Sequence, residues 1–371
     1  MASDYAIFGN IQMEITKLQL FSYRNYKQCE IDFKNGLNVI CGKNAQGKTN
    51  LLEAVYFCVV GKSFRASREK EVINHDSDIA RIKLFIKKEI GNSIVEIIFS
   101  RKEKKTVKIN GVPIKKISEL LGEFNGVFFS PDELKLIKES PEDRRRFMDI
   151  DISQTNKQYF YLLNRYNQIL QNRNKQLKMN LKREELVDIM KIWNTQLASC
   201  SLKIAKYRQN FVYMLAPFAE KAHSYLTDSK EKLGLEYVGI EEKTEEDIIT
   251  HLEKNLDKDL ALGYTSYGPH RDDIKVTING VDVRTYGSQG QQRTCALSLK
   301  LAELDIIKSQ INTKPVLLLD DVLSELDDDR KNRLLSYCQN SQALISCTSF
   351  NYDVQCNKIE IENGEVKENK E

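Results

Sequence analysis

The sequence predicts an α/β fold that combines an antiparallel β subdomain with a helical insertion. Three observations support this prediction. An apolar run at 36–41 leads through a glycine-containing loop into apolar residues at helical spacing, 50–56. Short runs that alternate polar and apolar residues precede and follow this unit. From residue 149 to about residue 226 the pattern is long-helical and contains no glycine.

Composition limits the possible classes of protein. The chain has 371 residues, enough for two or three domains, and is 41% hydrophobic and 29% charged, as expected of a globular protein. A net charge of +3 does not establish a nucleic-acid partner. The eight cysteines form no C-x-x-C pair, which favours a reducing compartment. Because no apolar run reaches about 18 residues and no signal-peptide pattern is visible, we expect a cytoplasmic protein.

The first elements are predicted to be antiparallel strands. We expect the folded domain to begin near Met13, with the preceding residues an extension or a misplaced start. Residues 14–20 read as a regular strand, and 29–33 alternate like a half-buried one. A turn at 34–36 then leads into the strand before the glycine loop.

The loop that follows matches G-x-x-x-x-G-K-[ST] between a predicted strand and a predicted helix. Glycines at 42 and 47 let successive N–H groups point at phosphate oxygens, aided by the positive end of the helix. Lys48 is then expected to contact the β- and γ-phosphates, and Thr49 to offer its hydroxyl to Mg²⁺. We therefore predict a nucleoside triphosphate site formed by Gly42, Lys43, Asn44, Ala45, Gln46, Gly47, Lys48, Thr49 and Asn50.

A β-rich segment follows the helix. Runs at 80–86, 93–99 and 106–109 read as strands, and Asn110-Gly111 predicts a tight hairpin turn. The basic loop at 61–65, which contains Arg65, is as compatible with a ligand contact as with plain solvation.

Three consecutive arginines, Arg144, Arg145 and Arg146, lie just after a helix start signalled by Ser140-Pro141. They fit a solvated helix face, and they fit equally a contact with the phosphates of a nucleotide or of DNA.

The helical insertion is predicted to be a hairpin of two long helices. Apolar residues recur every three or four positions on both sides of a polar link at 172–183. Trp193 is expected to pack in the seam between the helices, and Thr244 to start a further helix.

The last part of the chain, from about Leu262, supplies acidic and small polar residues. Residues 286–293 form a small-polar loop before a helix at 294–307. An apolar strand at 315–319 ends in Asp320 and Asp321. We expect Asp320 to hold Mg²⁺ through water, and Asp321 to orient or deprotonate the attacking water.

Two features separate this chain from compact phosphate-loop enzymes. The span from Lys48 to Asp320 is long, and Ser288, Gln289, Gly290, Gln291 and Gln292 form a second anion site at a helix start. In ABC-type ATPases such an S-x-G-Q-Q signature binds the ATP held by a partner subunit. The chain thus resembles an ABC-type head.

Within that class, the ordered motifs at 42–54, 61–65, 129–134, 140–147, 268–273, 287–294 and 317–327 resemble the RecF family over about residues 13–350. This resemblance implies an SMC-like two-lobed ATPase head with a short helical excursion. It implies ATP and Mg²⁺ as cofactors, an ATP-dependent homodimer, slow DNA-dependent hydrolysis that releases DNA, and action at gapped duplex DNA. It further implies RecO, RecR and RecA as partners in replication, recombinational repair and the SOS response to DNA damage. The expected parts are 13–145, 146–261 and 262–365.

The resemblance also assigns residues. Lys48, Asp320 and Asp321 are expected to be catalytic, Thr49 and Asp320 to hold the metal, and residues 288–292 to act on the partner's nucleotide. The loop between the two sites is expected to be Ser324, Glu325, Leu326 and Asp327. Contacts with DNA are assigned by charge alone to Arg65, Arg144, Arg145 and Arg146.

The chain departs from the ABC pattern in two places. The switch histidine after the last core strand is missing, and only Cys347 or Thr348 stands there. No glutamine-loop residue can be assigned near 129–133. His270 fits a satisfied turn residue as well as an interface residue.

Two other functions remain as alternatives. A structural clamp would use nucleotide only to stabilise a dimer, which the intact Lys48, Asp320 and Asp321 argue against. A small-molecule kinase would not need the signature loop at 288–292.

Overall fold

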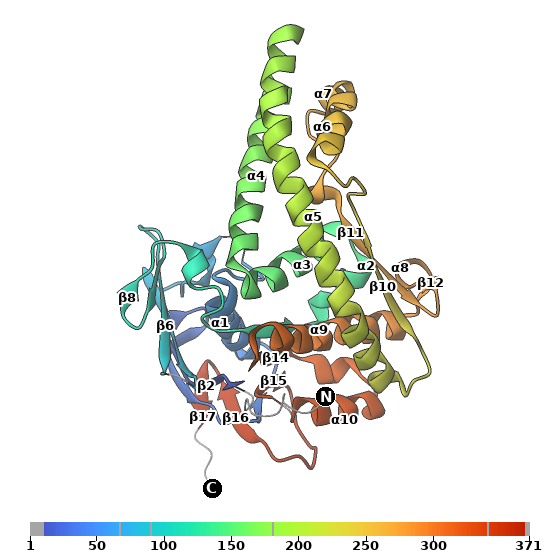
Figure 1. Cartoon of the computed structure of the whole chain (residues 1–371). Helices are drawn as coiled ribbons and strands as arrows, with labels where there is room; N and C mark the ends of the chain where they lie inside the picture. Colours follow the sequence, from blue (N-terminus) through green and yellow to red (C-terminus); the bar gives the residue numbers. More distant parts are fainter. Residues whose placement is uncertain (1–10, 67, 90, 180–181, 340, 368–371) are drawn as a thin grey trace, which may run out of the picture. The chain divides into compact units, whose positions relative to one another are not determined.

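The computed structural model describes residues 11–66, 68–89, 91–179, 182–339 and 341–367 (Figure 1). These residues form two compact units. The first takes the described parts of 1–133, 221–230 and 296–371, and the second those of 134–220 and 231–295. The three-part division into 13–145, 146–261 and 262–365 stays a proposal.

The first unit contains a mixed six-stranded sheet in the order β17-β16-β4-β15-β14-β9. Pairing is parallel throughout, except between β16 and β17. Four of its strands are buried at every position, which explains their largely apolar sequences. The strands are β4 (Leu37–Cys41), β9 (Gly126–Phe129), β14 (Val316–Asp320), β15 (Ala343–Cys347), β16 (Asn357–Glu362) and β17 (Glu365–Lys367).

A second six-stranded sheet of the same unit is antiparallel, in the order β3-β2-β5-β6-β7-β8. Its alternating sequences give alternating burial, most regularly in β6. The predicted hairpin turn is confirmed, because Asn110 and Gly111 both have positive φ, 51° and 82°, between β7 and β8. The strands are β2 (Glu14–Tyr23), β3 (Tyr26–Asp32), β5 (Ile79–Lys87), β6 (Ser93–Ser100), β7 (Thr106–Ile109) and β8 (Val112–Pro113).

The main hydrophobic core joins these two sheets through α1 (Lys48–Val60). Ten of the 13 residues of α1 are buried, as expected for a helix that is apolar on nearly every face. Phe57 of α1 packs edge-to-face on Phe99 of β6, with ring centroids 4.9 Å apart. The helix that begins with the phosphate loop is therefore held on both sides by sheets.

The remaining elements of the first unit extend its edges. β1 (Ile11–Gln12) pairs in parallel with β13 (Thr313–Lys314), so the described fold includes two residues before Met13. The other residues of the expected extension, 1–10, lie outside the described residues. α10 (Asp328–Cys338) follows β14, and most of α9 (Gln289–Ile311) belongs to this unit.

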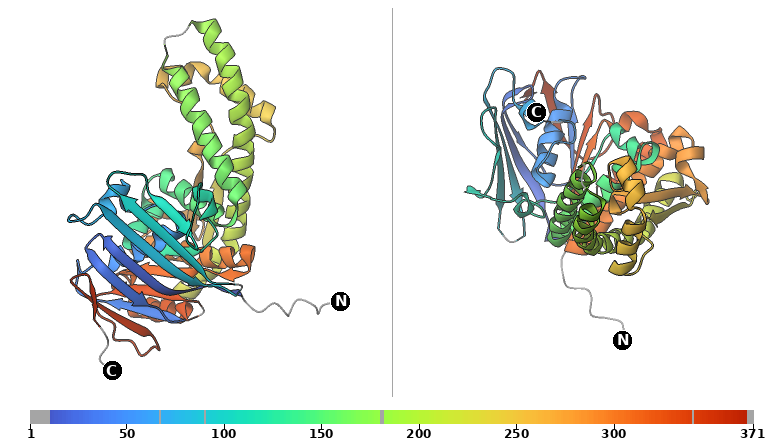
Figure 2. Two further views of the ribbon diagram at one scale, coloured as in Figure 1. Left: turned by 90° about the vertical axis from the view of Figure 1, so that its left-hand side faces the viewer. Right: turned by 90° about the horizontal axis from the view of Figure 1, so that it is seen from above.

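The second unit is built on the predicted helical hairpin. α4 (Lys157–Leu177) and α5 (Arg183–Thr227) lie side by side in both views (Figure 1, Figure 2). Arg173 of α4 donates a hydrogen bond to Asn194 of α5, and Arg208 of α5 donates one to the Tyr159 hydroxyl of α4. The two helices are therefore antiparallel. The link is shorter than the expected 172–183 because α4 continues to Leu177. α5 also runs through Pro217 without ending there.

Shorter elements complete the second unit. α3 (Pro141–Thr155) begins as predicted, with the Ser140 hydroxyl accepting from the N–H of Glu142. Thr244 likewise caps α6 (Glu245–Lys254). A three-stranded antiparallel sheet has the order β10-β11-β12. The other elements are α2 (Lys135–Lys138), α7 (Leu256–Leu262), α8 (Val283–Tyr286), β10 (Leu233–Val238), β11 (Asp273–Ile278) and β12 (Val281–Asp282).

None of the helices in the described parts of the chain is long and apolar enough to cross a membrane.

Candidate functional site

The glycine loop connects β4 to α1 and is braced by the turn between β2 and β3. Asn25 donates from Nδ2 to the carbonyl of Gln46 at 2.9 Å, and the Tyr26 hydroxyl donates to the carbonyl of Gly47 at 3.0 Å. Gly47 has φ 112°, and a Cβ there would lie 2.7 Å from Asn25 Nδ2. A Cβ on Gly42 would lie 2.4 Å from the carbonyl oxygen of Ile361. Both glycines of the motif are therefore required by close contacts.

The first turn of α1 is suited to an anion. No side chain among the described residues caps this helix, which leaves its first N–H groups for a ligand. The ammonium group of Lys48 donates to the carbonyls of Gly42 at 2.6 Å and Lys43 at 2.9 Å, so it lies across the loop. A phosphate anion is a stronger partner for this ammonium group than two neutral carbonyls.

Asp320 lies at the carboxyl end of β14, two strands from β4 in the sheet order. Thr49 Oγ1 donates to Asp320 Oδ1 at 3.0 Å, and Ser346 Oγ donates to the same oxygen at 2.6 Å. β4, β15 and β14 are neighbouring parallel strands, so their carboxyl ends meet at one edge of the sheet. Hydroxyl and carboxylate oxygens are ligands that Mg²⁺ accepts, so the residues fit that ion.

Ser346 was missed by the sequence reasoning. It is paired in register with Asp320 across β14 and β15, and it is fully buried. Its position one residue before Cys347, at the end of the last buried parallel strand, is the signal that could have identified it.

Asp321 follows directly and has φ 50°, an uncommon value for a residue with a side chain. Its N–H donates to Ser346 Oγ at 3.0 Å, which holds this conformation. Burial, together with the charge of Asp320, raises the pKa of the Asp321 carboxyl above its usual value of 3.8, while Lys48 opposes this shift. A carboxylate with a raised pKa is suited to accept a proton.

The loop after Asp321 is partly exposed. The Ser324 hydroxyl donates to the carbonyl of Asp321 at 2.7 Å, and Glu325 and Leu326 are half-buried. Asp327 caps α10 by accepting from the N–H of Arg330 at 2.9 Å.

A cavity of about 480 Å³ opens beside the glycine loop. Its walls come from the loop, from the segment after β15 and from the β16–β17 hairpin. They are Cys41, Gly42, Lys43, Gln46, Thr348, Ser349, Phe350, Asn351, Lys358, Glu360, Ile361, Glu362, Asn363 and Lys367. The segment that lacks the switch histidine thus lines the same hollow as the glycine loop.

A second network, which sequence reasoning did not identify, surrounds Glu53 of α1. Glu53 is fully buried and accepts from Arg24 Nη2 at 2.8 Å and from the Tyr23 hydroxyl at 3.0 Å. Ser63 of the basic loop also donates to it. This network ties the loop at 61–65 to the helix that begins the phosphate site.

Arg65 lies in that loop. Its Nη1 is 3.5 Å from Oδ1 of Asn50, which in turn donates from Nδ2 to Asn25 at 2.8 Å. The guanidinium of Arg65 therefore borders the phosphate loop. Because Arg65 is exposed, it also faces solvent.

The signature loop belongs to the second unit. Ser288 and Gln291 form a reciprocal cap: Gln291 N–H donates to Ser288 Oγ at 3.2 Å, and Ser288 N–H to Gln291 Oε1 at 2.9 Å. Gln289, the first residue of α9, is exposed. Gln292 is buried and donates to the carbonyl of Val283 at 3.1 Å, an internal role. A Cβ on Gly290 would meet only Ser288 Oγ, at 4.0 Å, among the described residues.

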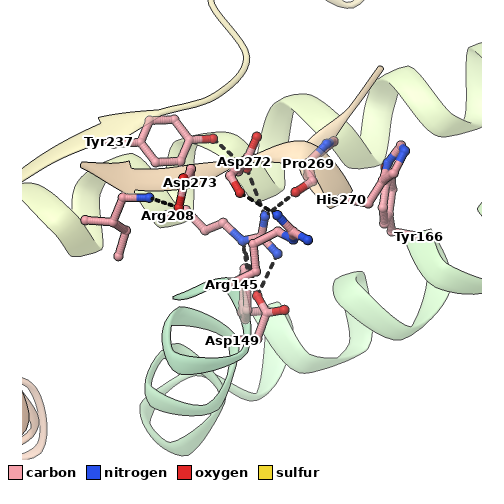
Figure 3. Close-up of polar contacts among 11 residues, drawn as sticks. Arg145, Asp149, Tyr166, Arg208, Tyr237, Pro269, His270, Asp272 and Asp273 are labelled. Carbon is pink, nitrogen blue, oxygen red and sulfur yellow. Dashed lines mark hydrogen bonds and ion pairs between the residues drawn. The ribbon is translucent and has the colours of Figure 1, made fainter. Parts of the chain in front are cut away.

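Arg208 is the centre of the polar cluster in Figure 3. Its guanidinium, 2% exposed, donates to Asp149 at 2.8 Å, to Asp272 at 2.9 Å and to the carbonyl of Pro269 at 2.6 Å. The Tyr237 hydroxyl donates to Asp272 at 2.7 Å. The cluster therefore joins α3, α5 and β10 to the segment at 268–273.

The three consecutive arginines have different environments. Arg144 is 3% exposed and contacts Asp273 through Nε and Nη2, at 2.5 and 3.1 Å. The structure does not support the predicted contact of Arg144 with DNA, because its guanidinium is buried and already paired with a carboxylate. Arg145 is half-buried and donates to the carbonyl of Asp272 at 2.8 Å (Figure 3), whereas Arg146 is exposed.

His270 is a satisfied turn residue in the second unit. One ring nitrogen lies 2.5 Å from the Tyr166 hydroxyl and the other 2.8 Å from the carbonyl of Thr265 (Figure 3). Burial lowers the pKa of His270 to about 4. The ring is therefore neutral at physiological pH.

Comparisons with known proteins agree with this geometry. The family described as RecF/RecN/SMC N terminal domain matches residues 14–360. The DNA replication and repair protein RecF of Alkaliphilus oremlandii is 45% identical over 344 residues, which are 91% of this chain and 93% of that protein. RecF of Clostridium kluyveri is 44% identical, again over 91% of this chain and 93% of the relative.

Solved structures give the same result. A RecF–ATP structure has TM-score 0.89 and 37% identity, covering 98% of this chain and 99% of the other. Its RecF-ATPrS counterpart has TM-score 0.87 and 38% identity, covering 95% and 97%. An Smc head domain from Pyrococcus furiosus, 18% identical with TM-score 0.55, covers 96% of this chain and 95% of its own, and shares the fold. The predicted SMC-like, ABC-type head with an antiparallel β subdomain and a helical hairpin is thus confirmed, and the chain belongs to the RecF family.

Proposed function

We propose that this protein is an ATP-dependent switch in recombinational DNA repair. It binds ATP with Mg²⁺, dimerises, binds DNA at gaps and single-strand–double-strand junctions, and with RecO and RecR assists loading of RecA. Slow, DNA-dependent hydrolysis then releases the DNA. The names of the relatives, DNA replication and repair protein RecF, and of the solved RecF–ATP complex in the RecFOR pathway support this proposal. The setting is cytoplasmic.

The observation that carries the proposal is the contact of Thr49 and Ser346 with the one oxygen of Asp320 beside the glycine loop. A hydroxyl and a carboxylate at the end of parallel strands, next to an uncapped helix start, are the parts that a Mg²⁺-nucleotide needs. Mg²⁺ bound there neutralises charge on the phosphates. Lys48 leaves its two carbonyl partners for the phosphates, and Asp321 orients and deprotonates the attacking water.

Dimerisation rests on the signature loop. Ser288, Gly290 and Gln291 act on the partner's nucleotide, whereas Gln292 positions the loop from inside. Gly290 supports this role because a Cβ there meets so little within the described chain. We infer that the absence of a side chain at Gly290 leaves room for a group from outside the chain, such as a phosphate held by a second copy. We assign the partly exposed loop at 324–327 to the boundary between the two sites.

Contacts with DNA are proposed for Arg65 and Arg146, the exposed members of the predicted set, and for the half-buried Arg145 to a lesser degree. Such contacts to backbone phosphates are independent of sequence and sensitive to salt.

Sedimentation velocity with ATP and Mg²⁺, with and without duplex DNA, tests the switch. The wild type is expected to dimerise on addition of ATP. Ser288→Arg is expected to bind ATP and stay monomeric, and Lys48→Arg to lose hydrolysis. Tyr213→Arg, at a residue 79% exposed in α5, controls for an added surface charge and is expected to behave as the wild type. A Ser288→Arg protein that dimerises normally would refute the shared-site arrangement.

A further inference from the structure

Two cysteines lie side by side at the edge of the phosphate site. Cys41 ends β4 and Cys347 ends β15, and their Sγ atoms are 3.8 Å apart. All eight cysteines are free thiols, and seven of them are buried. Cys41 precedes Gly42 of the glycine loop, and Thr348, which follows Cys347, lines the same cavity as Cys41, so the pair lies beside the proposed phosphate site.

The backbone places the two thiols at a separation suited to a disulfide. Cys41 and Cys347 are register partners across parallel neighbouring strands, so their side chains leave the same face of the sheet. Neighbouring strands are about 4.8 Å apart, and disulfides bridge Cα atoms about 4.4–6.8 Å apart. The spacing of the strands therefore suits a bond between the two sulfurs.

Cys41 is the reactive member of the pair. It lines the cavity of about 480 Å³ beside the glycine loop, so a small oxidant can reach it. The contact with the Cys347 thiol lowers the pKa of Cys41, with smaller contributions from Lys358 and Lys48 and against the effect of burial. The same contact raises the pKa of Cys347. A thiolate next to a protonated thiol is the pairing that peroxides oxidise readily.

We infer that Cys41 and Cys347 form a redox site that hydrogen peroxide converts to an intramolecular disulfide. The Cys41 thiolate attacks one peroxide oxygen, the O–O bond breaks, and the leaving hydroxide takes a proton to become water. Cys347 sulfur then attacks the resulting sulfenic acid, the S–O bond breaks, and the second hydroxide leaves as water with the proton of Cys347. Two thiols lose two electrons, and the peroxide is reduced to two waters. A dithiol reductant reverses the change.

The disulfide restrains the phosphate loop. Cys41 is bonded to Gly42, whose carbonyl accepts from Lys48 at 2.6 Å, and Thr348 next to Cys347 lines the same cavity. Joining the two sulfurs therefore tethers the start of the glycine loop to the segment after β15. Because a nucleotide needs that loop to adjust around its phosphates, the oxidised protein binds ATP more weakly. This consequence rests on the proposed ATP site, whereas disulfide formation does not.

Peptide mapping tests the disulfide. The folded full-length chain is treated with hydrogen peroxide, free thiols are alkylated, and peptides are analysed by mass spectrometry without reduction. The expected product joins the peptides of Cys41 and Cys347. Cys347→Ser is expected to give a Cys41 sulfenic acid that dimedone traps. Cys356→Ser, which removes the half-exposed neighbouring thiol, is expected to give the same disulfide as the wild type.

Two results of the mapping would overturn the inference: both thiols remaining free while other cysteines oxidise, or Cys41 joining Cys356. Binding of a fluorescent ATP analogue tests the consequence separately. The disulfide form is expected to bind about tenfold more weakly than the reduced form, and dithiothreitol to restore binding. Equal affinity of the two forms would overturn the restraint on the loop. A reduced protein that binds no ATP would instead count against the proposed function and leave the mapped disulfide standing.

Discussion

The loss of Arg208 is expected to destabilise the second unit, and Arg208→Met is the perturbation. The guanidinium is 2% exposed and bridges Asp149 and Asp272 while also donating to the carbonyl of Pro269. Methionine retains much of the aliphatic length but supplies no donor. The substitution therefore leaves two carboxylates without their cation.

The expected loss follows from the burial of these partners. Asp272 is 1% exposed and, among the described residues, keeps only the Tyr237 hydroxyl as a side-chain donor, whereas Asp149 is partly exposed and can be hydrated. Removing one partner of a buried ion pair costs about 3–5 kcal/mol, because the other charge stays buried and uncompensated. We expect a loss in this range in the free energy of unfolding.

The assay uses the single tryptophan of the chain, Trp193, which lies in α5 of the same unit as Arg208. Urea unfolding followed by its fluorescence therefore reports on this unit. Arg183→Met is the matched control, because Arg183 forms an ion pair with Asp257 in which the two side chains are 56% and 79% exposed. The control is expected to unfold like the wild type. A loss below about 1 kcal/mol for Arg208→Met, typical of exposed pairs, would refute the argument from burial.

The pH dependence gives a second check on the same variant. Burial raises the pKa of Asp272 above its usual 3.8, and Arg208 opposes this shift. An acid with a raised folded-state pKa stabilises the fold below its unfolded pKa, and that contribution is lost as pH rises through the folded pKa. Without Arg208 the folded pKa is higher still. The loss in free energy of unfolding caused by Arg208→Met should therefore be smaller at about pH 5 than at about pH 8.

Three further predictions concern the proposed site and the arginine run. Asp321→Asn is expected to retain ATP binding and lose hydrolysis. In the wild type, the raised pKa of Asp321 means that the ATPase rate should begin to fall with acidification at a pH above 3.8. A pH–rate profile would detect this. Ser346→Ala removes a donor that positions Asp320 and should lower the hydrolysis rate about 10–100-fold with a smaller change in ATP affinity; an equal fall in both would indicate general disruption. Arg146→Ala should leave unfolding unchanged and reduce the salt slope of DNA binding by about one, whereas Arg144→Ala should destabilise the chain; an unchanged slope for Arg146→Ala would remove it from the DNA contacts.

Features set by neighbouring residues could be predicted from the sequence. The Asn110-Gly111 turn and the caps at Ser140 and Thr244 depend on residues within one turn of each other. The glycine loop belongs to this group as well, because its curvature and the start of α1 need only the residues of the motif. The SMC-like fold class was predicted from the order of such motifs together.

The contacts that complete the site could not be predicted in this way. Ser346 meets Asp320 only because β15 lies between β4 and β14 in the sheet. Arg24 reaches Glu53 because the turn after β2 closes over α1. Each contact joins residues more than 20 positions apart, and no local pattern in the chain specifies that proximity.

The arginine run shows this division most clearly. The sequence by itself determined that a helix begins after Ser140 and that three positive charges occupy its first turns. Successive helical residues point about 100° apart, so three neighbours cannot share one environment. Only the tertiary structure decided that Arg144 is buried against Asp273 and Arg146 is exposed, since the carboxylate partner comes from 129 residues further along the chain.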